Sequence, residues 1–168
     1  MKRIVSNTSP IINLACIGQL DILRRLYGTI LIPQAVYDEI VRPDLNEPGS
    51  SEVRHSTWIQ VHAISNRHLV EALKLELDPG EAEAIACALE IKADWLLLDE
   101  RLGRTVAHRM GVRHIGLLGI LIEAKRQGVI ATIKPMLDEL KTKAGFWIAP
   151  PLYARVLEAA GETIGFLN

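Results

Sequence analysis

Acidic and amide side chains stand at the borders of apolar segments in this 168-residue sequence. They are Asn7 after the first apolar segment, Glu39 in VYDEI, Glu81 in DPGEAEAIACALE, and Asp99 and Glu100 after WLLL. Carboxylates that converge repel one another unless a cation lies between them, and oxygen ligands of this kind suit Mg²⁺ or Mn²⁺. Such an ion can activate water and support in-line attack on a phosphodiester. The pattern therefore indicates metal-assisted phosphodiester chemistry.

Each acid also has a purely structural explanation. Glu81 and Glu83 lie near an expected helix start, where negative charge complements the helix dipole. Asp99 can cap the helix that follows it, and Glu39 can be a solvated helix residue. Zinc chemistry has no support, because the five histidines and two cysteines form no pair at zinc-ligand spacing.

Apolar periodicity predicts alternating strands and helices, which is typical of a parallel sheet covered by helices. The strands are expected at residues 2–5, 29–32, 59–63, 95–98 and 112–115. The helices are expected at residues 10–14, 19–27, 33–41, 52–58, 67–77, 79–91, 101–110, 118–127, 133–144 and 152–160, with a loop at 42–51. We expect an α/β three-layer sandwich, with a domain at 1–128 and a helical extension at 129–168 packed on it. Because ligands bind at the carboxyl ends of parallel strands, the acids at strand ends are expected to meet.

Composition limits the kinds of partner and compartment. The net charge of −1 lacks the basic excess of a sequence-independent nucleic-acid binder, so any such contact must be local. Arg101 and Arg104 can supply it, although a solvated helix face explains them equally well. The absence of a signal sequence or an apolar span predicts a cytoplasmic protein without membrane contact.

The remaining reactive or large side chains have structural interpretations. Cys16 and Cys87 stand alone in apolar surroundings and are expected to be buried thiols. The three tryptophans are spread along the chain and are expected to pack in the core or an interface.

Several segments together resemble a PIN domain. They are VSNTSPIINLACIGQLDILRRLYG, IPQAVYDEI, DPGEAEAIACALEIKADWLLLDERLGRTVAHRMGV and IGLLGILIEAKRQGVI, and the tail FWIAPPLYARVLEAAGE resembles a PIN-like subfamily with a helical C-terminus (DUF3368-type). The resemblance implies the sandwich fold and an Mg²⁺- or Mn²⁺-dependent ribonuclease. It further implies a toxin of the VapC type, with RNA as substrate and a cognate antitoxin as partner. A homodimer is expected separately, because the apolar helices near residues 11–26 could dimerise, although burial in the core explains them equally well.

The resemblance also assigns roles to individual residues. The four catalytic positions of the family match Asn7, Glu39, Glu81 and Asp99. Metal ligands are expected at Asn7, Glu81, Asp99 and Glu100, and supporting roles at Thr8, Ser9 and Glu83.

Asn7 departs from the family, whose usual residue at that position is Asp. An amide keeps one carbonyl oxygen as a ligand but removes a full negative charge, so a cation is expected to bind more weakly. Two alternatives therefore stay open: a nuclease of reduced activity, or a catalytically impaired binding protein that acts through an antitoxin or RNA. A phosphoacceptor domain fits poorly, because it needs an acidic pair where Ser6 and Asn7 stand and a lysine where Gly116 stands.

Overall fold

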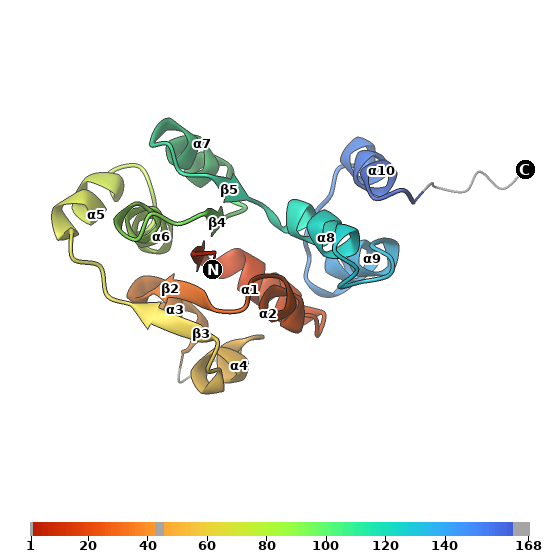
Figure 1. The fold of residues 1–168 in the computed structure, drawn as a ribbon, viewed down its shortest axis with the longest axis horizontal. Helices are drawn as coiled ribbons and strands as arrows, with labels where there is room; N and C mark the ends of the chain where they lie inside the picture. Colours follow the sequence, from red (N-terminus) through yellow and green to blue (C-terminus); the bar gives the residue numbers. More distant parts are fainter. Residues whose placement is uncertain (1, 43–45, 163–168) are drawn as a thin grey trace, which may run out of the picture.

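The structure is a computed structural model that describes residues 2–42 and 46–162. Within these ranges the chain forms one five-stranded sheet with the order β3-β2-β1-β4-β5, and all neighbouring strands are parallel (Figure 1). The strands are β1 (Ile4–Ser6), β2 (Ile30–Pro33), β3 (Ile59–His62), β4 (Trp95–Leu97) and β5 (His114–Ile115). The α/β sandwich predicted from the sequence is confirmed.

Helices cover both faces of the sheet, and the last three gather on the same side as the first two (Figure 1). The helices of the first half are α1 (Thr8–Cys16), α2 (Asp21–Tyr27), α3 (Gln34–Ile40), α4 (Ser50–His55) and α5 (Arg67–Leu73). Those of the second half are α6 (Pro79–Glu90), α7 (Arg101–Arg109), α8 (Leu117–Arg126), α9 (Lys134–Lys143) and α10 (Pro150–Ala159). No helix in the described ranges is long and apolar enough to cross a membrane.

Successive residues of the central strands enter two different cores, because side chains alternate between the faces of a sheet. Ile4 and Leu97 face one core, which they share with α1, α2, α8, α9 and α10. Val5, Leu96 and Leu98 face the other core, which is closed by α5, α6 and α7. The apolar run WLLL is therefore explained by a central strand buried on both faces, as the sequence indicated.

The chain order places a switch point at the centre of the sheet. From β1 the chain moves outward through β2 to β3, and it then returns to β4 on the other side of β1. Ser6 of β1 pairs with Leu97 of β4, and the backbone N–H of Asn7 donates to the Leu97 carbonyl at 2.9 Å. Both strands therefore end at the same level. In parallel α/β sheets, ligands bind at such a point, outside the carboxyl ends of the strands.

Element boundaries differ from the sequence-based expectations in a few places. Helix α1 begins at Thr8, where a start at residue 10 was expected, and Asn7 occupies its N-cap position. Helix α5 ends at Leu73, where a helix through Leu77 was expected, because turns carry the chain from there to the Asp78 cap of α6. Of the loop expected at 42–51, residues 43–45 lie outside the described residues, and α4 begins within it.

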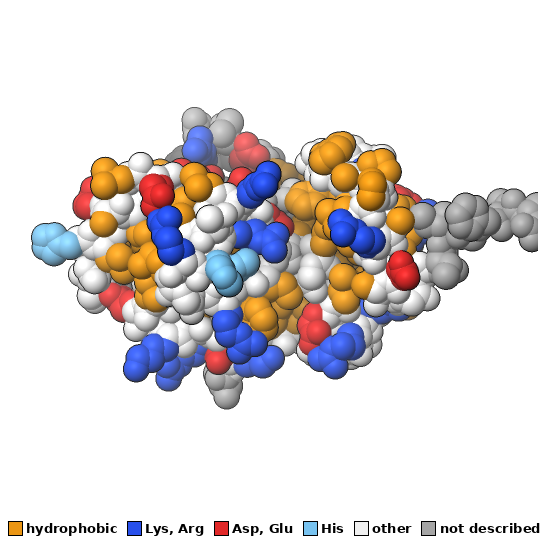
Figure 2. All heavy atoms as spheres, turned by 90° about the horizontal axis from the view of Figure 1, so that it is seen from above, with side chains coloured by type: hydrophobic (Ala, Val, Ile, Leu, Met, Phe, Trp, Pro, Cys, Tyr) orange, Lys and Arg blue, Asp and Glu red, His pale blue; other side chains and the backbone are white. Residues whose placement is uncertain are grey.

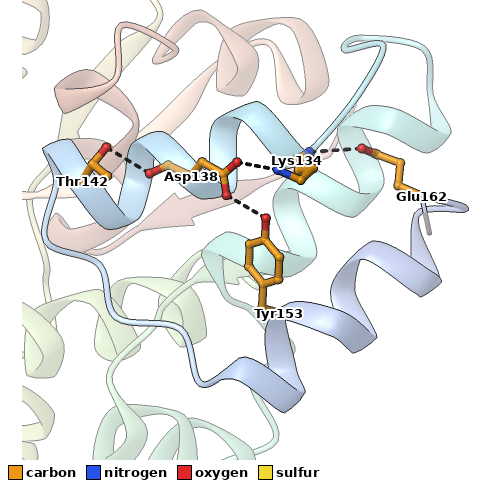
Figure 3. A network of polar contacts seen from close by, with 5 residues as sticks. All are labelled: Lys134, Asp138, Thr142, Tyr153 and Glu162. Carbon is orange, nitrogen blue, oxygen red and sulfur yellow. Dashed lines mark hydrogen bonds and ion pairs between the residues drawn. The ribbon is translucent and has the colours of Figure 1, made fainter. Parts of the chain in front are cut away.

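Helices α9 and α10 are tied together by a polar network, shown in Figure 3. The Tyr153 hydroxyl donates to Asp138 at 2.7 Å, and Asp138 also accepts from Lys134 at 2.9 Å. Glu162 accepts from the backbone amides of Ile133 and Lys134 at the start of α9. Apolar side chains of both helices enter the core that contains Ile4 and Leu97. The domain boundary expected at residue 128 stays a prediction. Residues 163–168 of the expected extension lie outside the described residues.

Candidate active site

Asn7 begins the site, at the carboxyl end of β1. It stands at the N-cap position of α1 in an extended conformation, yet its side chain makes no capping bond. An N-cap asparagine commonly accepts a backbone N–H bond. Here the Asn7 side-chain oxygen is buried and has no hydrogen-bond partner among the described residues. A buried oxygen without a partner is costly, so this atom is available to a ligand.

Glu39 reaches the same place from α3. Its Oε2 accepts from the hydroxyl of the buried Thr8 at 2.7 Å, which fixes the carboxylate next to the start of α1. Gly80 makes this approach possible: a Cβ there would lie 2.9 Å from Glu39 Oε2 and 3.5 Å from Asn7 Oδ1. Glu39 is thus more than a solvated helix residue, because a hydroxyl holds its carboxylate against the end of β1.

Asp78 and Glu81 bring α6 to the site. Asp78 caps α6 by accepting from the Glu81 amide at 2.8 Å, with Pro79 in the first turn. Burial, followed by the contact with Asp78 and the negative charges of Asp78, Glu100 and Glu39, raises the pKa of Glu81 from 4.5 to about 8. A carboxyl with a pKa in this range can exchange protons near neutral pH.

Asp99 follows β4, and its side chain turns away from the helix after it. Helix α7 has Glu100 at its N-cap and no side-chain capping bond, so the expectation that Asp99 could cap this helix is wrong. Asp99 Oδ1 instead accepts from the Leu117 amide at the start of α8, at 2.8 Å. The other oxygen, Oδ2, is buried without a hydrogen-bond partner in the described residues. Burial raises the pKa of Asp99, while the Leu117 amide and Arg104 oppose the rise.

Two adjoining cavities open on these side chains. A cavity of about 240 Å³ is lined by Asn7, Thr8, Glu39 and Asp78, and one of about 660 Å³ by Asp99 and Arg104. Both are also lined by Ser9, Asn13 and Glu100. The structure thus brings the four positions 7, 39, 81 and 99 to one edge of the sheet, around Glu100, whose charge acts on both Glu81 and Asp99.

Arg101 and Arg104 lie beside the acids on α7. They line a third cavity of about 420 Å³, together with Asp99, Thr105, His108 and His114. Figure 2 views the molecule from the side of α7 and α10 and shows Lys and Arg side chains spread over this face. These basic side chains can therefore provide a local positive surface next to the negatively charged site. Because the net charge of the chain is −1, any contact with nucleic acid needs such a local surface.

Glu83 is placed differently from the other acids. It is buried between α6 and α3, where its Oε1 accepts from the Ala35 amide at 3.3 Å and its Oε2 lies 3.6 Å from Arg67. These contacts join two helices and account for the residue. Neither Glu83 nor Glu81 lines the three cavities described above, so the contacts with Ala35 and Arg67 are what distinguish Glu83.

The donor atoms fit a hard divalent cation held in part through water. The buried oxygens of Asn7 and Asp99 have no partners in the described residues, and amide and carboxylate oxygens are the ligands that Mg²⁺ and Mn²⁺ prefer. Across residues 2–42 and 46–162, no three Asp, Glu, His or Cys side chains converge on one metal position. An ion at this edge would therefore use the Asn7 amide, or retain several of its waters.

Two residues at the site were not recognised from the sequence. Asp78 could have been found, because Asp-Pro at a helix start is a cap signal and Glu81 lies one turn further. Asn13 donates to Ser9 at 3.0 Å and lines both cavities. Its position one helical turn after Ser9 was the only available signal.

The tryptophans divide into two groups. Trp58 and Trp95 are partly buried against the core, and Arg113 lies over the Trp95 ring at 4.3 Å. Trp147, in contrast, is 79% exposed and lines the 660 Å³ cavity. It therefore does not pack in the core, and packing in an interface stays a prediction for this residue.

Comparison with known proteins agrees with this geometry. No curated protein is significantly similar to the chain. A family model, DUF3368, described as a PIN domain, matches residues 3–162 and therefore covers both the sheet and the helical extension. PIN domains are generally nucleases that use divalent metal ions. Since the match spans nearly the whole chain, this protein belongs to the PIN domain family.

Proposed function

We propose that this protein is an Mg²⁺- or Mn²⁺-dependent endoribonuclease, the toxin of a toxin–antitoxin pair. The observation that carries the proposal is the pair of buried, unpartnered oxygens on Asn7 and Asp99, beside Glu81 with its raised pKa, at the switch point of a PIN fold. The described protein offers neither oxygen a donor, so a bound ion or the waters around it can satisfy both.

Each residue then has a distinct role. Asn7 Oδ1 and Asp99 Oδ2 would hold the ion, with Glu100 within reach of its waters. When bound, the ion lowers the pKa of a water and stabilises charge on the phosphate. In its deprotonated form, Glu81 would accept the proton of the attacking water while the water oxygen bonds to phosphorus. The bond from phosphorus to the ribose oxygen breaks at the same time, and the leaving oxygen takes up a proton from solvent. Arg101 and Arg104 bind phosphates beside the cleaved bond.

The proposed partners follow from the same assignment. RNA is the substrate, a cognate antitoxin inhibits the toxin, and two copies of the chain form a homodimer. Family membership and the arginines on α7 support RNA as the substrate. The free thiols Cys16 and Cys87 suit the reducing cytoplasm, where we propose that the protein acts.

Cleavage of single-stranded RNA with Mn²⁺, and with excess EDTA, tests the catalytic assignment. Asp99→Asn keeps the acceptor for the Leu117 amide, so the variant should fold normally yet lose cleavage. Glu81→Gln should do the same. Glu76→Gln is the matched control, because Glu76 is exposed and paired with Arg109 away from the site. Equal cleavage in EDTA, or by the Asp99→Asn variant, would refute the mechanism.

A second candidate function is a catalytically impaired binding protein, and Asn7 is the observation that favours it. The amide leaves the site one negative charge short of the usual family pattern. Restoring the acid separates the two candidates. A large gain in cleavage rate for Asn7→Asp supports the impaired protein, and an unchanged rate supports a nuclease that works with the amide.

A further inference from the structure

The 660 Å³ cavity extends from the candidate active site to the helical extension. One end is polar and contains Asp99, Glu100 and Arg104. The other end is apolar and is formed by α8, by the segment after α9 and by α10, through residues such as Ile122, Phe146, Trp147 and Leu152. Figure 2 shows hydrophobic side chains on α10 and a hollow between the two parts of this face. The volume lies within the ~300–1,000 Å³ range of small-ligand sites.

Trp147 is unusual in this wall. A tryptophan that is 79% exposed leaves a large apolar surface in water, whereas the other two tryptophans pack against the core. It stands beside Phe146 in a segment between α9 and α10 that also lines the cavity. Aromatic rings at such positions are surfaces on which nucleobases stack.

The wall that carries these side chains is held in place. Tyr153 of α10 donates to Asp138 of α9 at 2.7 Å, and Glu162, just after α10, accepts from two amides at the start of α9 (Figure 3). Lys125 of α8 donates to the same Glu162 at 3.0 Å. A wall fixed before binding lowers the ordering cost that a ligand must offset.

The charge of Arg104, and its position between two neighbouring cavities, indicate which kind of ligand the cavity can bind. Arg104 lines both this cavity and the neighbouring cavity that contains Arg101, so it stands between an aromatic pocket and a second guanidinium. A nucleotide has matching chemistry, because its base can stack and its phosphate pairs with a guanidinium. The amide of Asn13 on the cavity wall adds hydrogen-bonding groups that a base edge can meet.

We propose that the cavity binds one unpaired nucleotide of the RNA substrate, next to the cleaved bond. The base stacks on Trp147 in the apolar end, and its phosphate pairs with Arg104. The helical extension thereby takes part in substrate binding and restricts the enzyme to single strands. This inference rests on the proposed nuclease function, since it takes RNA as the substrate.

Binding measured in EDTA, where no strand is cut, tests the inference without relying on activity. The probes are a short fluorescein-labelled single-stranded RNA and an abasic ribose-phosphate oligomer of equal length and charge. Trp147→Ala should weaken RNA binding about tenfold and leave the abasic oligomer unaffected, because only the stacked base is lost. Trp147→Phe should retain most of the affinity. Leu75→Ala, which removes another highly exposed side chain outside the cavity, is the control.

The outcomes separate this inference from the proposed function. If the wild-type protein binds RNA and Trp147→Ala binds it equally well, the pocket is wrong while the nuclease proposal stands. An equal loss for RNA and for the abasic oligomer also overturns the pocket. If the wild-type protein does not bind RNA in EDTA, the pocket is wrong, and the cleavage assay with Mn²⁺ decides the nuclease proposal separately.

Discussion

Replacing Asn7 with Asp should destabilise the metal-free protein. Glu39 Oε2 and Asn7 Oδ1 both lie within 3.5 Å of the position that a Cβ on Gly80 would occupy, so these oxygens are no more than about 6.5 Å apart. The repulsion of two unit charges at this distance is about 0.6 kcal/mol in water and about 2.6 kcal/mol at an effective dielectric constant of ~20. Asn7 is 4% exposed, which favours the upper part of this range.

A divalent ion should reverse the sign of this effect. The added carboxylate is a stronger ligand than the amide, so Mg²⁺ or Mn²⁺ should bind the folded variant more tightly and stabilise it by linkage. We expect the variant to be less stable than the wild type in EDTA by about 1–3 kcal/mol. With the metal present, the difference should shrink or invert.

Urea unfolding, followed by circular dichroism at several Mg²⁺ concentrations, measures both quantities. The matched control is Asn66→Asp, the same amide-to-acid change at the exposed cap of α5, where Asp is an equally good capping residue. The reasoning is refuted if Asn7→Asp has wild-type stability in EDTA and both proteins respond equally to Mg²⁺. That result would mean that position 7 faces neither Glu39 nor a cation.

Two further predictions concern groups around the site, and a third concerns the helical extension. Because the pKa of Glu81 rises from 4.5 to about 8, the metal-free folded state keeps a proton that the unfolded chain releases. The free energy of unfolding of the metal-free protein should therefore fall as pH rises through this window. The free energy of unfolding of Glu81→Gln, measured over the same pH range, should depend less on pH. Gly103→Ala would place a Cβ 2.8 Å from Glu81 Oε2, so RNA cleavage assays should show a strong loss, with a melting temperature near that of the wild type. A normal cleavage rate would show that the carboxylate can move freely. Tyr153→Phe removes the hydrogen bond to Asp138 and should lower the free energy of unfolding, measured with urea, by about 1 kcal/mol. An unchanged free energy of unfolding would contradict the view that this bond stabilises the packing of α10 on α9.

The sequence was sufficient for the fold class because hydrophobic periodicity reports local burial. WLLL implied a strand covered on both faces, and its residues do divide between two cores. Helix ends were less certain. The expected α5 was too long, because the turns after Leu73 depend on where α6 is capped rather than on local propensity.

The site residues illustrate a different limit. Residue type at strand ends identified Asn7 and Asp99 as candidates, since the carboxyl ends of parallel strands share one edge. The sequence could not decide that Asp99 turns toward Leu117 of α8 rather than capping α7, nor that Glu83 fastens α6 to Ala35 of α3. Both outcomes depend on partners that are distant along the chain.

The amino-acid sequence by itself determined the α/β architecture, the family signature and the order of the acids along the chain, because these are properties of local pattern and spacing. Only the tertiary structure decided which oxygens are buried without partners, that Asp78 and Asn13 line the same hollow, and that the exposed Trp147 lines one cavity with Arg104. Each of these depends on long-range packing between helices and strand ends, and burial there is set by neighbours that no local pattern encodes.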